Sequence, residues 1–529
     1  MIAILPELGE SVPATTINRW RVSPMQAVIS TADAVVAGNR DCVLVGGFEN
    51  MSRPRNPTLA GLARRNAGIL ILRIRYQRMT DGPIHLNLFT MNSVEHVSPG
   101  SWRAEGDQSS RYTDREYWTE VARTAERGGF DAVFFADVRG MYDVYGGDRE
   151  TAVKRAIQTP ANDPQQLVSA MAEVTEKLGF AITRSTTYTH PYQLAREFST
   201  LDHITDGRIA LNVVTSYLES AAENLGLSGR MDKQTRYDRA DEFMDVCYAL
   251  WEDSWEDGAV VRDGDEGTYT DPDKVAPIDF EGEFFSVPGP HGCEPSPQRT
   301  PVIYQAGSSD RGREFAAANA EAVFVSQPTE SGVREYMTDL KQRAGRLGRD
   351  PESLQFFLGV VPIVGETSDA AQQKYDNYKS NVDIEGTLAL LSGFLDMDLS
   401  ELDPDQQIDH IETDAIQGTM NAFTQSAPDR DWTVREVAEF SGLGSTSPVI
   451  VGTPETVADE LQRWHRDVGV HGFNLKEIVR PGTLTDFVDL VIPELRERGL
   501  VRESPTGSTL REHLSGDGNP RLRADHPSR

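Results

Sequence analysis

Several hydroxyl, amide and carboxylate side chains lie where apolar runs of this chain end. Asp137 ends the run AVFFAD, Thr183 and Ser185 lie in FAITRST, and Asn212 and Thr215 lie in RIALNVVTS. A polar side chain at the end of a buried strand needs a hydrogen-bonding partner. A bound heteroaromatic ring with carbonyl groups would supply such partners, and so would neighbouring backbone. For Asp137 the alternative role is the N-cap of a following helical turn.

A second polar group separates an apolar run from a helical pattern. The segment AGSSDRGREFAA places Ser308 and Ser309 at the predicted start of a helix. Backbone N–H groups and hydroxyls at a helix N-terminus bind phosphate, and the helix dipole favours its negative charge. A serine at a helix start also serves as an ordinary cap. These two serines are therefore candidates for a phosphate site, with capping as the alternative.

Other common catalytic arrangements are absent from the sequence. The ten histidines are scattered, without an HxH, HExxH or two-histidine-one-carboxylate spacing, so we predict no metal site. No GxGxxG follows an apolar run, and neither a Walker motif nor a GxSxG elbow occurs. The sequence therefore gives no support to metal catalysis, to nucleotide loops of those kinds or to a serine hydrolase.

Eight short runs rich in Val, Ile and Phe have the composition of buried parallel strands. Seven of them follow helix-like segments, and this alternation favours a (β/α)8 TIM barrel over an open doubly wound sheet. A barrel brings the carboxyl ends of all strands to one reaction face. The predicted strands are 85–91, 132–137, 180–186, 208–214, 300–307, 320–327, 354–365 and 472–479.

Amphipathic stretches separate the predicted strands. In REYWTEVARTAERGG, Trp118, Val121, Ala122 and Ala125 share one helical face, and the Gly128-Gly129 pair ends the helix. Two long insertions follow strands four and seven, at 252–299 and 366–450, and we expect both to rise over the reaction face as active-site lids. Polar residues 515–529 are expected to form a disordered tail.

The first 78 residues do not join the barrel pattern. Residues 13–55, which include TINR, MQAVISTADAVVAGNRD and VLVGGFENMSR, resemble the thiolase segment around the nucleophilic cysteine. Arg21 stands where thiolases have that cysteine, and Pro24 stands where they have glycine. We interpret residues 1–78 as a thiolase-like remnant and linker, joined by gene decay or a wrong start, ahead of a barrel domain at 79–514. A genuine fusion with a docking role is the alternative.

The charge of the chain is strongly negative. The 529 residues include 82 Asp and Glu against 52 Lys and Arg, of which eight are Lys, giving a net charge of −30. This balance is typical of chains adapted to a salty cytoplasm, where salt screens self-repulsion, although an acidic mesophilic protein is also compatible. It argues against nucleic acid and anionic membranes as partners. Three cysteines give no disulfide framework, and no signal peptide or membrane span is evident, so a cytoplasmic location is expected.

Several segments between about residues 79 and 514 carry a family resemblance. They include HLNLFTM, GGFDAVFFADVRGMYDVYGG, STTYTHPYQLAREFSTLDHITDGRIALNVVTS, SPQRTPVIYQAGSSDRGREFAA and GFNLKEIVRPGTLTDFVDLVIPELRERGLV. This pattern resembles flavin-dependent monooxygenases of the bacterial luciferase superfamily, in the branch that oxidises nitrilotriacetate, dibenzothiophene sulfone or long-chain alkanes. The resemblance implies a homodimeric enzyme that takes reduced FMN from a separate NAD(P)H:flavin reductase. The flavin would react with O2 to a C4a-peroxyflavin and oxygenate a small organic substrate.

The resemblance also implies roles for individual residues. Relatives often carry His where this chain has Lys233, four residues before the tyrosine that matches Tyr237, and both positions lie near FMN; a lysine can still pair with phosphate. His96 follows the first strand, near the reacting oxygen, where a neutral imidazole donates a hydrogen bond or moves a proton. Tyr142 is expected to line the same pocket. The other FMN contacts implied are Asp137, Thr183, Ser185, Asn212, Thr215, Ser308 and Ser309.

Two other functions stay open from the sequence. One is an F420-dependent oxidoreductase, because the same superfamily includes such enzymes. The other is a non-catalytic flavin-binding barrel, because Lys233 departs from the family pattern and the N-terminal segment is atypical.

Overall fold

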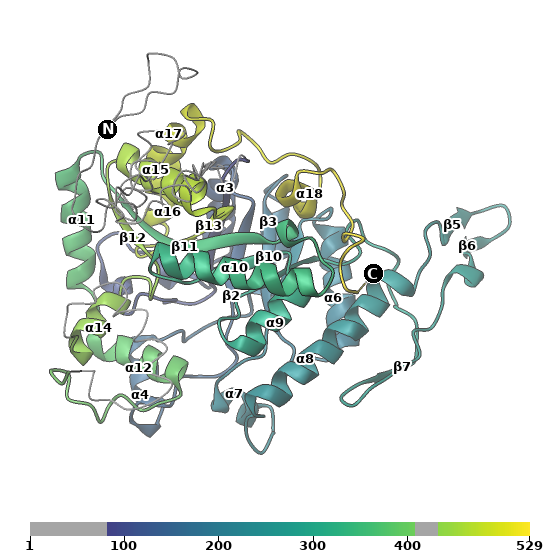
Figure 1. Ribbon diagram of the computed structural model, residues 1–529, viewed down its shortest axis with the longest axis horizontal. Helices are drawn as coiled ribbons and strands as arrows, with labels where there is room; N and C mark the ends of the chain where they lie inside the picture. The colour runs from purple at the N-terminus through teal and green to yellow at the C-terminus, as the bar shows by residue number, and fades with distance from the viewer. Residues whose placement is uncertain (1–81, 408–431, 529) are drawn as a thin grey trace, which may run out of the picture. The chain divides into compact units, whose positions relative to one another are not determined.

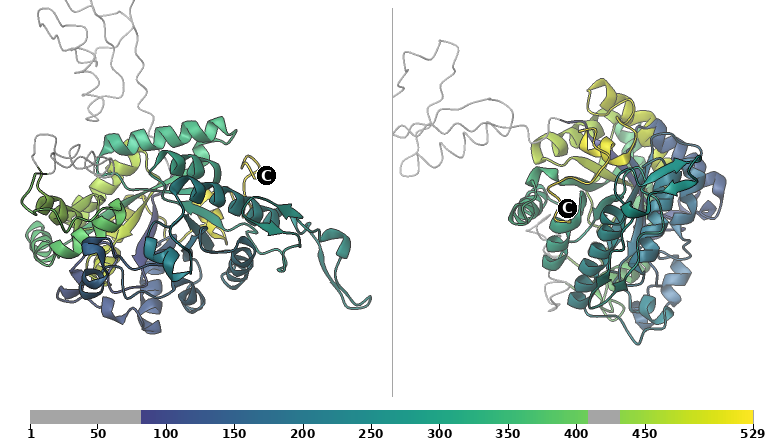
Figure 2. Two further views of the ribbon diagram at one scale, coloured as in Figure 1. Left: turned by 90° about the horizontal axis from the view of Figure 1, so that it is seen from below. Right: turned by 90° about the vertical axis from the view of Figure 1, so that its right-hand side faces the viewer.

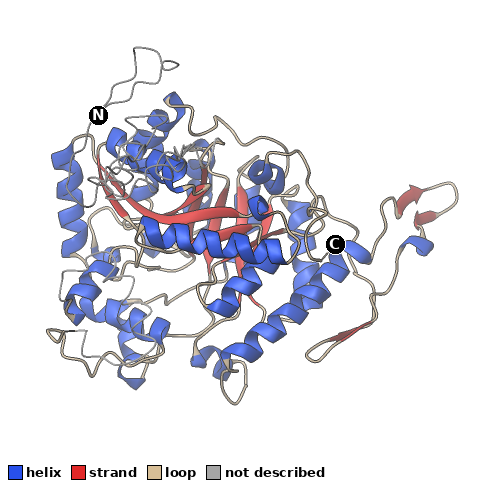
Figure 3. Ribbon diagram, in the orientation of Figure 1, coloured by secondary structure: helices blue, strands red, loops and turns tan. Residues whose placement is uncertain are grey.

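In the computed structural model, which describes residues 82–407 and 432–528, eight parallel strands close into a barrel (Figures 1 and 3). The strands pair in chain order, and the pairing of the last with the first closes the ring. The predicted (β/α)8 barrel is thus confirmed. Its strands are β1 His85–Met91, β2 Ala132–Ala136, β3 Gly179–Ser185, β4 Ile209–Val214, β9 Val302–Gln305, β10 Ala322–Val325, β11 Gln355–Val364 and β13 Gly472–Lys476.

Aromatic side chains set against alanines fill the barrel interior. Phe89, Phe134 and Phe324 meet at its centre, and the Phe89 ring lies 4.9 Å, between centroids, from each of the other two. An eight-stranded barrel has just enough width for side chains to fill it, so large residues must face small ones. The interior is therefore a packed core, and a ligand must bind at an open end. The small residues are Ala132, Ala181, Ala210 and Ala322.

Helices surround the strands on the outside, as Figure 3 shows in blue around red. In α3, Arg115–Arg127, the buried residues include Trp118, Val121, Ala122 and Ala125, and Gly128 caps the helix, as predicted. No helix in the described part of the chain is long and apolar enough to cross a membrane. Other outer helices are α5 Val168–Ala172, α6 Pro191–Ile204, α8 Lys233–Tyr248, α9 Asp310–Asn319, α10 Glu330–Arg346, α15 Pro454–Arg463, α16 Gly482–Asp486 and α17 Ile492–Glu497.

The insertion at 366–450 covers the carboxyl ends of β1 and β2, as predicted. Within its described residues, Asp383 donates its backbone N–H to Pro99 O in the loop after β1, at 2.9 Å. Gly393 packs so closely on Tyr142, which follows β2, that a Cβ atom would lie 2.2 Å from the tyrosine ring. The insertion forms α11 Ser368–Ser380, α12 Ile384–Leu395, α14 Val434–Ser441 and β12 Val449–Gly452, and α12 packs against α14 and against α4 Glu150–Arg155 (Figure 1).

The insertion at 252–299 does not rise over the reaction face, so that prediction was wrong. It begins after α8, which has already returned the chain to the amino ends of the strands, and it leads directly into β9. Gln298 donates to Ile209 O, at the first residue of β4, at 2.9 Å. Two hairpins of this insertion project from the barrel in Figures 1 and 2. They are β5 Val260–Asp263 with β6 Thr268–Thr270, and β7 Phe280–Glu281 with β8 Ser286–Val287.

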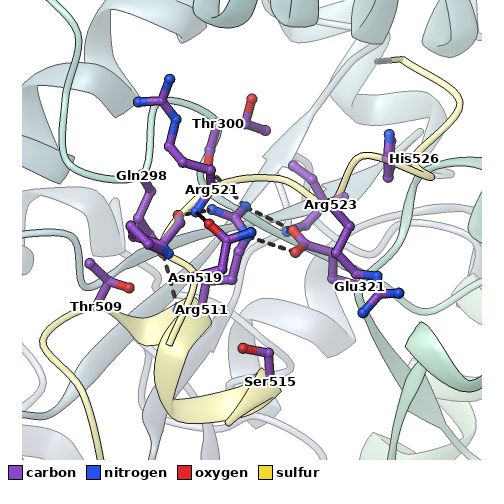
Figure 4. Close-up of polar contacts among 12 residues, drawn as sticks. Gln298, Thr300, Glu321, Thr509, Arg511, Ser515, Asn519, Arg521, Arg523 and His526 are labelled. Carbon is purple, nitrogen blue, oxygen red and sulfur yellow. Dashed lines mark hydrogen bonds and ion pairs between the residues drawn. The ribbon is translucent and has the colours of Figure 1, made fainter. Parts of the chain in front are cut away.

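The C-terminal segment is not disordered, contrary to expectation, but packs under the amino ends of the strands (Figure 4). In α18 Leu510–Ser515, Arg511 donates to both carboxylate oxygens of Glu321, at 2.7 and 2.9 Å. Further along, Leu522 is buried and the His526 ring is hydrogen-bonded to Asn319 O. The polar composition misled us because the arginines and carboxylates of this segment pair with partners distant in the sequence.

Candidate functional site

A pocket of about 350 Å³ lies beyond the carboxyl ends of β4 and β9. It lies at the reaction face of the barrel, where side chains after several strands converge. Arg236, Tyr217 and Gln305 also line it and were missed from the sequence. Six of the predicted site residues line the pocket: Asp137, Thr215, Lys233, Tyr237, Ser308 and Ser309.

One end of the pocket is built around the N-terminus of α9. The Ser309 hydroxyl caps the helix by accepting from Gly312 N at 3.2 Å, so the capping role is real. The next N–H groups of the first turn have no acceptor within the helix and suit an anion. Gly312 must be glycine here, because a Cβ atom would lie 2.7 Å from the Tyr237 hydroxyl. Close approach of α9 to α8 thus brings the helix N-terminus and Tyr237 together.

Two cations of α8 stand beside this N-terminus. Lys233 is exposed at the first residue of α8, and Arg236 lies one turn later on the same face and is buried. The Arg236 guanidinium donates to Ser216 O, and no carboxylate of the described residues forms an ion pair with it. Burial, and then the nearby Arg230, lower the Arg236 pKa from its usual value. A buried cation of this kind is suited to bind a phosphate. In the sequence, only the position of Arg236 three residues after Lys233 could have pointed to this residue.

Polar side chains at the ends of β3 and β4 form two separate hydrogen-bonded groups. Asn212 donates to Thr183 Oγ1 at 2.8 Å, and Thr183 donates to Phe135 O at 2.6 Å. The Ser216 hydroxyl donates to that of Ser185 at 2.8 Å. The Asn212 Oδ1 atom is buried without a protein partner and leaves an acceptor for a ligand donor. Backbone and neighbouring side chains therefore satisfy part of this group, as the sequence analysis allowed.

Asp137 is held at the pocket wall directly after β2. Its carboxylate lies 3.7 Å from the Arg184 guanidinium, which also pairs with Asp163 at 2.8 Å. Burial raises the Asp137 pKa to about 6, and Arg184 opposes the rise only in part. Near neutral pH, Asp137 is therefore a carboxylate that gains a proton more readily than an ordinary aspartate.

His96 and Tyr142, the two predicted catalytic residues, are joined through Gln158. The Tyr142 hydroxyl donates to Gln158 Oε1 at 3.1 Å, and Gln158 Nε2 donates to His96 O at 2.7 Å. The Tyr142 hydroxyl is also hydrogen-bonded to that of Tyr217, which lines the pocket. Gln158 and Tyr217 had no motif to mark them in the sequence. The row links the pocket to the loop after β1.

The His96 side chain is kept neutral by its surroundings. Its ring packs edge-on against Phe89, with centroids 4.6 Å apart. Burial lowers the His96 pKa well below its usual value, and the nearby Arg480 and Lys476 lower it further. A neutral imidazole can donate one hydrogen bond and accept another. Among residues 82–407 and 432–528, no group of three His, Cys, Asp or Glu side chains is arranged to hold a metal ion.

Comparison with known proteins identifies two family matches. Residues 93–472 match the luciferase-like monooxygenase family, and residues 1–68 match the N-terminal domain of thiolase. The chain is 47% identical to dimethyl-sulfide monooxygenase of Hyphomicrobium sulfonivorans, over 84% of this chain and 93% of that protein. It is 48% identical to long-chain alkane monooxygenase of Geobacillus thermodenitrificans (strain NG80-2), over 84% and 96%. It is 38% identical to nitrilotriacetate monooxygenase component A of Aminobacter aminovorans, over 84% and 99%.

Solved structures show the same likeness. The crystal structure of DmoA from Hyphomicrobium sulfonivorans superposes with a TM-score of 0.80 at 47% identity, over 84% of this chain and 95% of that chain. A riboflavin lyase solved with modified FMN and riboflavin superposes with a TM-score of 0.77 at 34% identity, over 84% and 99%.

Proposed function

This chain belongs to the luciferase-like monooxygenase family and is a flavin-dependent monooxygenase, and on that premise we propose that its flavin is FMN, used in the reduced form. Together with O2, the flavin would place one oxygen atom into a small organic substrate. The observation that carries the proposal is the pocket beyond β4 and β9, where the cations of α8 and the N-terminus of α9 line one cavity with polar residues that follow β2 and β4.

The phosphate end of the pocket fits a phosphate ester. Arg236 and Lys233 supply positive charge, and Ser308 and Ser309 supply hydroxyl and backbone donors at the start of α9. Arg236 takes over, in this proposal, the contact that a histidine makes in relatives at the position of Lys233. A buried guanidinium that lacks a carboxylate partner gains an anionic partner when phosphate binds.

The other end fits a polar ring. The unpartnered Asn212 Oδ1 accepts from a ring N–H, and Thr183, Ser185 and Thr215 offer hydroxyl groups around it. When bound, reduced FMN supplies the electrons that activate O2, and the protein supplies binding, orientation and exclusion of water. The neutral His96 ring and the Tyr142 hydroxyl lie at the reacting end, where they position or move a proton.

A separate reductase is the proposed source of reduced FMN. The nitrilotriacetate relative is named as a component A, which supports a system of more than one protein. Reduced flavin must then reach this pocket from another protein, and the described residues place the pocket at the barrel's open end rather than inside its packed core.

The test is an anaerobic titration of the purified chain with photoreduced FMN in high KCl, followed by flavin fluorescence. We expect saturable one-to-one binding, weaker binding of oxidised FMN, and oxygen consumption that depends on an added substrate. A chain that binds reduced F420 and not reduced FMN would instead be an F420-dependent oxidoreductase. A chain that binds FMN but only releases peroxide with every substrate class would be a non-catalytic flavin barrel.

A further inference from the structure

Lys476 is the last residue of β13, and its side chain points into the open end of the barrel. It pairs in register with Phe89 of β1, which belongs to the packed interior. Its Nζ atom lies 5.9 Å from the centre of the Phe89 ring and 5.7 Å from that of Phe324. Two residues earlier, Asn474 faces inward too, accepting from Asn87 Nδ2 at 3.0 Å. Because side chains alternate along a strand, Lys476 faces inward like Asn474, but two residues closer to the carboxyl end of β13.

Among the residues that the structure describes, the buried ammonium group of Lys476 has no anionic partner. It donates one hydrogen bond, to Gly444 O at 2.9 Å, in the insertion that covers the reaction face. Within residues 82–407 and 432–528, no carboxylate forms an ion pair with it. Burial alone lowers the pKa of Lys476 to about 7. An ammonium group has three donors, so two are left over. A buried charge without a counter-charge is costly, and an anionic ligand would relieve that cost.

The barrel order places Lys476 across the reaction face from the phosphate end of the pocket. Around the ring of eight strands, β13 lies four strands from β4 in either direction. If the phosphate of FMN is held beyond β4 and β9 and its ring N–H meets Asn212, we expect the rest of the ring to extend across the reaction face toward the ends of β13 and β1. His96 lies on that same side, against Phe89. Lys476 is therefore on the side of the reaction face toward which we expect the ring of FMN to extend.

We propose that Lys476 is a cofactor-binding residue, whose ammonium faces the ring of reduced FMN and balances its negative charge. The proposal rests on the proposed function above. Reduced FMN carries a negative charge on its ring near neutral pH, whereas the ring of oxidised FMN is neutral. A cation at the ring therefore favours the reduced form selectively, which is one way a protein tunes a flavin. Gly444 O holds the ammonium in place without neutralising it.

The test compares the affinities of Lys476→Met and of the wild-type chain for photoreduced and for oxidised FMN. We expect the variant to lose about tenfold or more in affinity for reduced FMN, and to change little toward oxidised FMN, because only the reduced ring is charged. Each tenfold loss specific to the reduced form lowers the two-electron midpoint potential of bound FMN by about 30 mV, which a dye-coupled titration measures directly. Lys476→Arg, which keeps the charge, should stay close to the wild type.

Two controls separate the possible outcomes. Lys341→Met removes a half-buried lysine of α10 that pairs with Glu352, and it should leave both affinities unchanged. Lys476→Gln is a second uncharged variant in case the methionine variant does not fold. Equal weakening of both forms by Lys476→Met, or no weakening, would overturn the proposal, and so would a wild-type chain that binds both forms equally. Failure of the wild-type chain to bind either form would instead refute FMN as its cofactor.

Discussion

Arg236 is the single residue on which phosphate binding should depend most. Arg236→Met removes the buried guanidinium at the phosphate end of the pocket. Hydrogen bonds to charged groups contribute about 1.5–3 kcal/mol, so we expect FMN affinity to fall roughly ten- to a hundredfold. Riboflavin has no phosphate, and its affinity should change little. Fluorescence titrations with the two flavins measure both effects.

The control for this substitution lies one turn further along α8. Arg239→Met removes a guanidinium that stacks on Phe285 at 4.2 Å, outside the pocket, and it should leave the ratio of FMN to riboflavin affinity unchanged. If Arg236→Met weakened FMN and riboflavin equally, the residue would support the pocket wall through Ser216 and would not bind phosphate.

The ionised Asp137 carboxylate destabilises the folded chain, so the contribution of Asp137 to stability depends on pH. Burial raises its pKa from 3.8 to about 6, so the folded chain holds the proton more tightly than the unfolded chain. The free energy of unfolding must therefore fall as pH rises from about 4 to about 6, and it stays lower above that window. Asp137→Asn should raise the free energy of unfolding by about 1–3 kcal/mol at pH 7.5, and by less at pH 5. Urea unfolding at the two pH values checks this.

Asp163 gives a matched comparison, because it shares Arg184 with Asp137. Burial acts to raise the Asp163 pKa, but the Arg184 guanidinium and further hydrogen bonds bring it below its usual value. Asp163→Asn should therefore destabilise the chain at pH 7.5, the opposite sign to Asp137→Asn. The same sign for both substitutions would contradict the assigned environments.

At the scale of elements, the approach of α9 to α8 shapes the phosphate end. Gly312→Ala places a Cβ atom 2.7 Å from the Tyr237 hydroxyl and 3.1 Å from Gly307 Cα, so the helices must move apart. Overpacking of this kind costs about 1–3 kcal/mol, and we expect FMN affinity to fall about tenfold or more as the N-terminus of α9 shifts. Gly345→Ala in α10 is the control, since its Cβ atom would meet only Pro351 Cγ at an ordinary 3.5 Å. It should bind FMN like the wild type.

At the scale of the barrel, the C-terminal segment secures the amino ends of the strands. Arg511→Met removes the buried bidentate partner of the Glu321 carboxylate, whose side chain is only 15% exposed (Figure 4). Breaking a buried ion pair costs about 3–5 kcal/mol, so the free energy of unfolding should fall by that amount. Arg521→Met breaks a pair with the exposed Asp257 and should cost less than about 1 kcal/mol. Denaturant unfolding measures both free energies. Equal losses would contradict a stabilising role for the Arg511–Glu321 pair. FMN affinity should be unchanged in both variants.

At the scale of the whole chain, residues 1–78 are predicted to be dispensable. The described residues form the eight strands of the barrel and line the pocket. A chain that begins at Met79 should therefore fold in molar KCl and bind reduced FMN with wild-type affinity. Circular dichroism and the anaerobic titration measure these properties. If that chain were insoluble in molar KCl while the full chain folded, the interpretation of residues 1–78 as a remnant would be wrong.

The sequence by itself determined the barrel and the polar side chains that follow its strands at the reaction face. Strand and helix periods are local, so eight apolar runs, the buried face of α3 and its end at Gly128 could be read without contacts. Parallel strands share one direction, so residues that follow them, such as Asp137 and Thr215, had to meet at one face. Their roles toward FMN stay predictions.

Only the tertiary structure decided which charges are buried and what they face. The burial of Arg236 depends on how α8 packs at the end of β4, where its guanidinium donates to Ser216 O, and that of Lys476 depends on closure of the ring between β13 and β1. The direction of residues 252–299 follows from α8 returning to the amino ends of the strands, and the order of the C-terminal segment follows from pairing with Glu321. These outcomes depend on contacts between residues far apart in the chain, which composition and periodicity do not encode.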